Sequence, residues 1–165
     1  MKLPAGRRDG LRLNLSAVSV LKLAVLRWNE QFETGHALID TQHKMLIGYI
    51  NRLEGMARIT NPTREEVEFF FQLVEFIETY VNVHFSQEES CMERHQCPAY
   101  QENKTAHAHF VEFFRGFKQH FQAHGFRPDV VADLYNSCST WIQQHILHVD
   151  VQLKPCLKQG GGAGK

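Results

Sequence analysis

The sequence predicts an all-α fold, an antiparallel up-down-up-down four-helix bundle preceded by an irregular N-terminal arm. Four segments repeat apolar residues at intervals of three and four, the period of an amphipathic helix. Short stretches with Gly, Pro or Asn separate these segments, and short connections favour antiparallel neighbours. No segment shows a competing strand pattern. A chain of 165 residues is long enough for one domain with a real core.

The composition argues against several classes of partner. Eighteen Lys and Arg balance eighteen Asp and Glu, so no net field favours nucleic acid or an anionic membrane. No apolar run reaches the ~20 residues that a membrane-spanning helix needs. The four cysteines lack the spacing and density of a disulfide scaffold, so we interpret them as free thiols, with a Cys91–Cys97 bridge as the alternative. A cytoplasmic protein is therefore expected.

The first predicted helix follows a region without helical periodicity. Residues 1–27 are interpreted as an N-terminal extension, either a flexible or weakly helical segment or the result of a misassigned start. Residues 28–35 have polar residues and a glycine that favour an irregular arm. A helix is expected over residues 37–56. One of its faces carries Ile39, Leu46, Ile50, Leu53 and, in the same stripe, His43.

The second predicted helix places two polar residues on its apolar face. It begins at a capping box, in which Thr63 precedes Glu66 by three residues, and runs to about residue 93. Its apolar stripe consists of Val67, Phe70, Val74, Ile77 and Val81. The next two positions of the stripe are His84 and Glu88, so both are expected to point into the core. A buried ionised carboxylate is costly unless a cation or hydrogen-bond donors meet it.

Proline and glycine mark the boundaries of the last two helices. Pro98 precedes a helix over residues 99–123, which Gly125 ends, and Pro128 begins a helix that fades near Pro155. We therefore expect a bundle over residues 28–155 and a disordered Gly-rich tail over residues 156–165. The core stripes of these helices contain Asn103, His107, Phe110, Phe114, Phe117 and Phe121, then Val130, Leu134, Trp141 and His145.

Each helix thus contributes a ligand-type side chain where an apolar one is expected. These side chains are His43, His84, Glu88, Asn103, His107 and His145. A lone core histidine is ordinarily a hydrogen-bonded structural residue, but four helices that share the pattern favour a pair of iron or manganese ions in the bundle core. Asp150 lies about 140° further round an ideal helix than His145, so it joins the site only if the helix loosens there or if the metal lies between the two side chains; a solvated Asp is the alternative.

Over about residues 28–153 the chain resembles the hemerythrin family, specifically the bacterial hemerythrin-like domains. The resemblance rests on Trp28 with Gly35 and Ile39-Asp40-Thr41-Gln42-His43-Lys44, on His84-Phe85-Ser86-Gln87-Glu88-Glu89, on Pro98-Ala99-Tyr100 with His107 and Phe110, and on Trp141-Ile142-Gln143-Gln144-His145-Ile146 with Asp150. It implies a non-haem pair of iron ions, oxo- or hydroxo-bridged, that binds dioxygen at an open position on one iron. By position it implies that His43 and His84 hold one iron, that His107 and His145 hold the other, and that Glu88 and Asp150 bridge them.

Asn103 is a departure from the family pattern, which has His-x-x-x-His on the third helix. Asn103 takes the first place and His107 keeps the second. His109 is a poor substitute, because two residues along a helix point in nearly opposite directions. The second iron would keep two imidazoles, with either the Asn103 amide oxygen or a water as a weaker donor. A site with an exchangeable position on both metals is typical of a catalyst more than of a reversible carrier.

Three alternative functions follow from this pattern. The first is a di-iron protein that binds dioxygen as a carrier, store or sensor. The second is a di-iron peroxidase or oxidase that acts on peroxide or dioxygen, and the third is a metal-poor bundle that serves as an interaction module. The oligomeric state is left open. The aromatic residues expected in the core and around the site are Phe69, Phe70, Phe71, Phe76, Phe110, Phe113, Phe114, Phe117 and Phe121.

Overall fold

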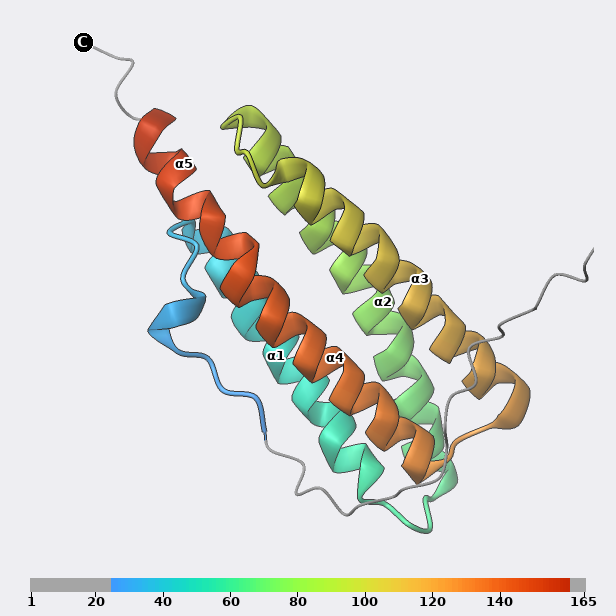
Figure 1. The fold of residues 1–165 in the computed structure, drawn as a ribbon. Helices are drawn as coiled ribbons and strands as arrows, with labels where there is room; N and C mark the ends of the chain where they lie inside the picture. Colours follow the sequence, from blue (N-terminus) through green and yellow to red (C-terminus); the bar gives the residue numbers. More distant parts are fainter. Residues whose placement is uncertain (1–24, 161–165) are drawn as a thin grey trace, which may run out of the picture.

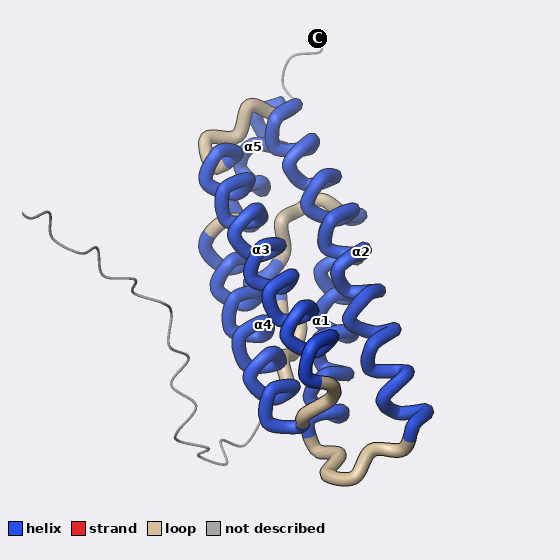
Figure 2. Tube along the Cα trace, turned by 90° about the vertical axis from the view of Figure 1, so that its right-hand side faces the viewer, coloured by secondary structure: helices blue, strands red, loops and turns tan. Residues whose placement is uncertain are grey.

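The structure is a computed structural model that describes residues 25–160, and four long helices form an up-down-up-down bundle (Figure 1). They are α1 (Ala37–Ala57), α2 (Arg64–Arg94), α3 (Tyr100–His124) and α4 (Pro128–His148). The arm before α1 contains a 3-10 turn, η1 (Glu30–Phe32), and α4 continues through a second one, η2 (Asp150–Gln152), into α5 (Leu153–Gly160). No strand occurs among the described residues (Figure 2). The predicted fold class is therefore confirmed.

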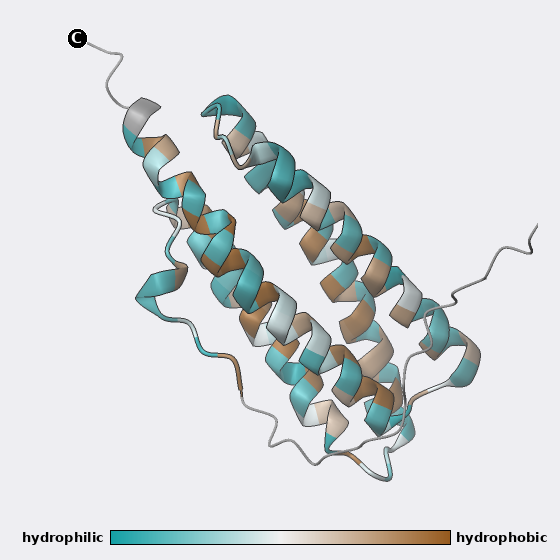
Figure 3. Cartoon of the chain, in the orientation of Figure 1, coloured by the Kyte–Doolittle hydropathy of each residue, from teal (hydrophilic) through white to brown (hydrophobic). Residues whose placement is uncertain are grey.

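The four helices pack as two pairs that share one core. Helix α1 packs against α4 and α2, and α2 packs against α3, so the first and last helices of the bundle lie side by side (Figure 1). Hydrophobic residues cluster on the helix faces that meet in the interior (Figure 3). Phe70, Phe110, Phe114 and Phe121 are fully buried there, and each such ring contributes roughly 1.5–3 kcal/mol by burial. No helix of the described part is long and apolar enough to cross a membrane.

The helix boundaries follow the local signals in the sequence. Thr63 and Glu66 form the predicted capping box: the Glu66 N–H donates to the Thr63 hydroxyl, and the Glu66 carboxylate accepts from the Thr63 N–H. Gly125 follows α3 with a φ of 76°, a left-handed conformation that glycine adopts at low cost. Pro128 is the first residue of α4, where its missing N–H has no helical partner to lose.

Three of the aromatic residues expected in the core lie on the surface instead. Phe69, Phe76 and Phe113 are 43%, 45% and 37% exposed. Phe76 packs on the flank between α1 and α2, where its ring contacts the rings of Tyr49 and Tyr80. The expectation is wrong for these three because α2 and α3 carry more phenylalanines than their inward faces can hold.

Both ends of the described chain differ from expectation. Leu26, expected in a separate extension, packs against the main core, and its backbone exchanges two hydrogen bonds with the Asn51 side chain at 3.1 and 2.8 Å. Residues 156–160 are helical where a disordered tail is expected, because Leu153 and Cys156 are buried and anchor α5. Pro155 lies in the first turn of α5, where it breaks no helical hydrogen bond. Residues 1–24 and 161–165 lie outside the described part.

Cys97 and Cys156 form a disulfide. The expectation of free thiols is therefore wrong for these two residues and confirmed for Cys91 and Cys138, and the alternative Cys91–Cys97 bridge does not form. Cys91 is buried on α2, whereas the turn after α2 directs Cys97 toward α5. The pairing was not predictable because α5 itself was not predicted as a separate helix.

Replacing Thr63 by Ala removes one half of the capping box. We expect Thr63→Ala to lower the free energy of unfolding by about 1 kcal/mol, measured by urea denaturation, because the Glu66 N–H at the start of α2 loses its acceptor, the Thr63 hydroxyl. Thr79→Ala is the matched control: Thr79 is exposed within α2 and bonds only the carbonyl of Glu75. Equal effects of the two substitutions would contradict a capping role.

Candidate metal centre

All seven predicted ligand residues lie in the interior of the bundle. They are His43 on α1, His84 and Glu88 on α2, Asn103 and His107 on α3, His145 on α4 and Asp150 at the start of η2. None is more than 7% exposed, which is unusual for polar groups and unusual above all for two carboxylates. The helical stripes thus bring the polar residues of separate helices to one place.

The ligand-type atoms form two neighbouring groups that share Glu88. One group contains His43, His84 and Glu88, and in the other Glu88 is joined by His107, His145 and Asp150. Within each group one ligand atom per residue lies within 4.8 Å of the others, close enough to surround one ion. The arrangement therefore offers two adjacent positions for a cation.

Each carboxylate spans the two groups. Glu88 directs Oε1 toward His43 Nε2 at 3.9 Å and Oε2 toward His107 Nε2 at 3.5 Å. Asp150 directs Oδ2 toward His43 Nε2 at 3.3 Å and Oδ1 toward His145 Nε2 at 3.0 Å. One oxygen of each carboxylate thus faces one group and the other oxygen faces the second.

A change of helix type brings Asp150 into the site. Helix α4 ends at His148, Val149 has a φ of −113° and a ψ of −60°, and the chain then tightens into the 3-10 turn η2, which Asp150 begins. On a continuous α-helix Asp150 would point about 140° away from His145. The structure therefore decides against a solvated Asp150, because this side chain is 1% exposed and faces two imidazoles.

Two polar side chains outside the ligand set orient the histidine rings. His84 Nδ1 lies 3.1 Å from Gln42 Oε1, and His107 Nδ1 lies 3.0 Å from Glu89 Oε1. Because both partners are oxygen acceptors, each Nδ1 carries the proton and the Nε2 lone pair is left available for a metal. Neither Gln42 nor Glu89 was predicted to act here, although both lie beside predicted ligands in the sequence.

Burial keeps these imidazoles neutral. Desolvation, together with the nearby His43, lowers the pKa of His84 to about 3. Desolvation also lowers the pKa of His107, although its bond to Glu89 opposes the shift. Both rings are therefore unprotonated at neutral pH, the form that binds a metal.

Aromatic side chains fix the planes of two of the rings. Phe85 stacks on His107, with ring centroids 3.7 Å apart and planes 7° from parallel, and Trp141 stacks on His145 at 4.3 Å and 13°. Stacked neighbours restrict rotation of the imidazoles about their side-chain bonds. Each stacked neighbour covers one face of its imidazole, so packing holds both rings in place.

Asn103 occupies the position at which the family pattern has a histidine. Its Oδ1 lies 2.8 Å from His145 Nε2, while its Nδ2 donates to Glu88 Oε2 at 3.4 Å and to the sulfur of Met92 at 3.3 Å. The two acceptors hold the amide so that its oxygen faces the imidazole group. Met92 was not predicted as a partner, since a buried methionine on an apolar stripe has no distinguishing sequence signal.

Several buried atoms of the site have no hydrogen-bond partner within the protein. These atoms are His43 Nδ1, His43 Nε2, Glu88 Oε1 and Asp150 Oδ1; His43 Nε2 and Asp150 Oδ1 have ionisable neighbours at 3.3 and 3.0 Å, but not in hydrogen-bond geometry. Buried polar atoms without partners are rare because each costs free energy, so this cluster suits a cation better than a hydrogen-bonded core. The donor set of imidazole nitrogens and carboxylate oxygens fits a pair of transition-metal ions.

The pKa values of the two buried carboxylates are shifted in opposite directions. Burial, and then the charge of Asp150, raise the pKa of Glu88 well above its ordinary value. Burial also acts to raise the pKa of Asp150, but the contacts with His145 and His43 outweigh it and hold that pKa well below its ordinary value. The protein alone thus stabilises one negative charge at the centre, and a second requires added positive charge.

Comparison with known proteins agrees with this site. Residues 34–157 match the family model described as "Hemerythrin HHE cation binding domain". A bacteriohemerythrin of Pseudomonas aeruginosa is 28% identical over 78% of both chains, and that of Methylococcus capsulatus is 28% identical over 82% of this chain and 98% of its own. A crystal structure of wild-type hemerythrin superposes with a TM-score of 0.71 at 25% identity, covering 81% and 98% of the two chains. The chain belongs to the hemerythrin family.

Glu88→Gln tests whether the buried charge of Glu88 destabilises the metal-free protein. At pH 7 the Glu88 carboxyl is ionised in the unfolded chain, but burial disfavours the ionised form in the folded protein. We therefore expect the free energy of unfolding of Glu88→Gln at pH 7 to exceed that of the parent by an amount on the order of 1–4 kcal/mol. The gain should shrink as the pH falls toward about 4.3, where the unfolded carboxyl is itself protonated.

Urea denaturation of chelator-treated protein measures this difference. Glu102→Gln on the exposed side of α3 is the matched control and should change stability by less than about 0.5 kcal/mol. A Glu88→Gln variant that is less stable than the parent at pH 7 would show that the protein already satisfies this carboxylate without a cation.

Proposed function

We propose that the protein is a non-haem di-iron protein that binds dioxygen, as a carrier, store or sensor. The observation that supports this most directly is the pair of buried carboxylates, each with one oxygen toward each histidine group. In this proposal His43 and His84 hold one iron, His107 and His145 hold the other, and Glu88 and Asp150 bridge them. Asn103 supplies its amide oxygen to the second iron or leaves that place to water.

A di-iron pair would supply a reducing centre at which dioxygen is held. The protein contributes neutral imidazoles whose Nε2 atoms are directed inward, and it contributes two bridging anions that balance the charge of the ions. The stacked rings of Phe85 and Trp141 exclude bulk water from the site. The bacteriohemerythrin relatives support the same class of function for this chain. The cytoplasmic location stays a prediction.

Iron content tests the proposal. Protein expressed with iron available should carry about two irons per chain and absorb in the near-ultraviolet and visible as a bridged ferric pair does. His107→Ala should lose iron, whereas the control His109→Ala should keep it, because His109 is exposed two residues further along α3. Folded protein that takes up no iron, or that prefers zinc or manganese with iron present, would overturn the di-iron assignment.

A second candidate function, a di-iron peroxidase or oxidase, is favoured by one observation. Asn103 is buried with its oxygen 2.8 Å from His145 Nε2, where an imidazole would complete the ligand set of the second iron. An amide oxygen is the weaker donor, so this ion would exchange its outer ligand more readily. Peroxide would then have a place to bind beside Glu88.

Asn103→His distinguishes the two candidates. In the enzyme, the added imidazole should tighten metal binding and lower the turnover of hydrogen peroxide with a reductant, because the exchangeable position is filled. Asn136→His, on the exposed face of α4, is the control and should change neither quantity. If Asn103→His prolongs the life of an oxygen adduct and leaves turnover unchanged, the protein is a carrier or sensor and the enzymatic candidate fails.

A further inference from the structure

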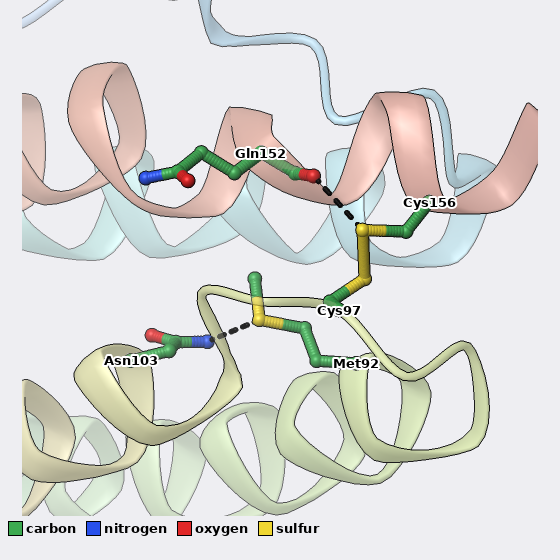
Figure 4. The surroundings of a disulfide bond; sticks show 5 residues. All are labelled: Met92, Cys97, Asn103, Gln152 and Cys156. Atoms are coloured by element: carbon green, nitrogen blue, oxygen red, sulfur yellow. Dashed lines mark hydrogen bonds between the residues drawn. A yellow bond between two sulfur atoms is a disulfide. The ribbon is translucent and has the colours of Figure 1, made fainter.

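A disulfide joins α5 to the turn between α2 and α3 (Figure 4). Cys97 lies in that turn and Cys156 lies in α5, and 59 positions separate them in the sequence. Their Cα atoms are 5.6 Å apart, a usual separation for a disulfide. The bond therefore connects two segments that meet only in the tertiary fold.

Apart from the disulfide, α5 is held mainly by a small apolar cluster. Leu153 and Cys156 belong to a small apolar cluster with Ile39 and Met92, separate from the main core. Lys154 lies 3.9 Å from Glu33, but both side chains are about half exposed, so this pair contributes little. A helix of eight residues is not stable by itself. The disulfide is therefore a major restraint on the position of α5.

The same bond links two residues of the candidate metal centre. On one side α5 follows η2 directly, and η2 begins with Asp150. On the other side the Cys97 N–H donates to the Met92 carbonyl at 2.9 Å, and the Met92 sulfur accepts from Asn103 Nδ2 (Figure 4). The disulfide thus closes a connection around the centre that runs from Asp150 to Asn103.

The structure also accommodates the reduced pair. The sulfur of Cys156 lies 3.2 Å from the Gln152 carbonyl oxygen, so a thiol there has an acceptor for its proton. Cys156 lies in a short terminal helix and Cys97 lies in a turn, where local opening admits a small reductant. Cys91 and Cys138, by contrast, are unpaired and buried in long helices, and burial raises the pKa of both thiols. Cys91 and Cys138 are therefore poor nucleophiles.

We propose that Cys97 and Cys156 are a redox-active pair that exchanges with small thiols and disulfides, and that its state controls how firmly α5 holds Asp150 at the centre. In reduction, two small thiols give up two electrons and two protons and become a disulfide, while the Cys97–Cys156 bond breaks and each sulfur gains a proton. Oxidation is the reverse exchange with a small disulfide. The oxidised form holds α5 against the bundle, and the reduced form releases it.

Alkylation and hydrogen exchange test this on the full chain. Under denaturing conditions, iodoacetamide should modify two cysteines in protein treated with oxidised glutathione and four in protein treated with dithiothreitol, as read by intact mass. In the native protein, reduction should speed amide exchange in residues 150–158 and leave residues 130–140 of α4 unchanged. Failure to form the disulfide, or equal exchange in both states, overturns the proposal.

Two variants separate the pair from a general effect of removing thiols. Cys97→Ser and Cys156→Ser should each exchange like the reduced parent, with or without oxidised glutathione. Cys138→Ala removes a buried thiol of the main core and should keep the full difference between the oxidised and reduced states. A Cys97→Ser variant that protects residues 150–158 as well as the oxidised parent does would contradict the proposal.

The consequence for the metal rests on the proposed function. Iron-loaded Cys97→Ser should release iron to a chelator faster than the oxidised parent does, because Asp150 is held less firmly, and Cys138→Ala should match the parent. Using a variant avoids exposing the iron to a reductant. If the protein takes up no iron, only the proposed function is refuted, because hydrogen exchange still tests whether the cysteine pair controls α5. If the parent and Cys97→Ser release iron equally fast, the disulfide does not control the metal centre.

Discussion

Two carboxylates buried among four imidazoles impose the main constraint on this bundle. An apolar core rejects such groups, yet Glu88 and Asp150 are at most 1% exposed. The protein compensates them unequally: His145 and His43 favour the ionised form of Asp150, whereas burial favours the protonated form of Glu88. A cation between the two histidine groups would remove the remaining cost of burying an ionised Glu88.

Outer contacts hold the site residues in position. Gln42 and Glu89 select the same tautomer in two histidines, and Phe85 and Trp141 restrict the ring planes of His107 and His145. These partners come from α1, α2 and α4, which also carry His43, His84, Glu88 and His145, whereas Asn103 and His107 lie on α3. A centre built this way is preorganised, because its ligands need little rearrangement to surround an ion. The helical scaffold thus supplies the precision that a metal site requires.

The C-terminal segment ties the fold to the centre. The change from α4 to the 3-10 turn η2 directs Asp150 inward, and α5 continues from that turn to the α2–α3 connection. There the Cys97–Cys156 bond fastens it. One continuous stretch of chain therefore links the buried Asp150 carboxylate to a covalent restraint, so a short terminal helix is connected to the candidate metal centre.

The sequence by itself determined the four helices and the inward direction of most site residues, because a helical period of 3.6 residues fixes which side chains share a face. It predicted the capping box at Thr63 and the stripe that ends in His84 and Glu88. Only the tertiary structure decided the position of Asp150 and the pairing of Cys97 with Cys156. It also decided which side chains contact the site residues, namely Gln42, Glu89 and Met92. The same holds for the surface location of Phe69, Phe76 and Phe113. These features depend on how a helix ends and on which distant segments meet, and periodicity along one helix contains neither.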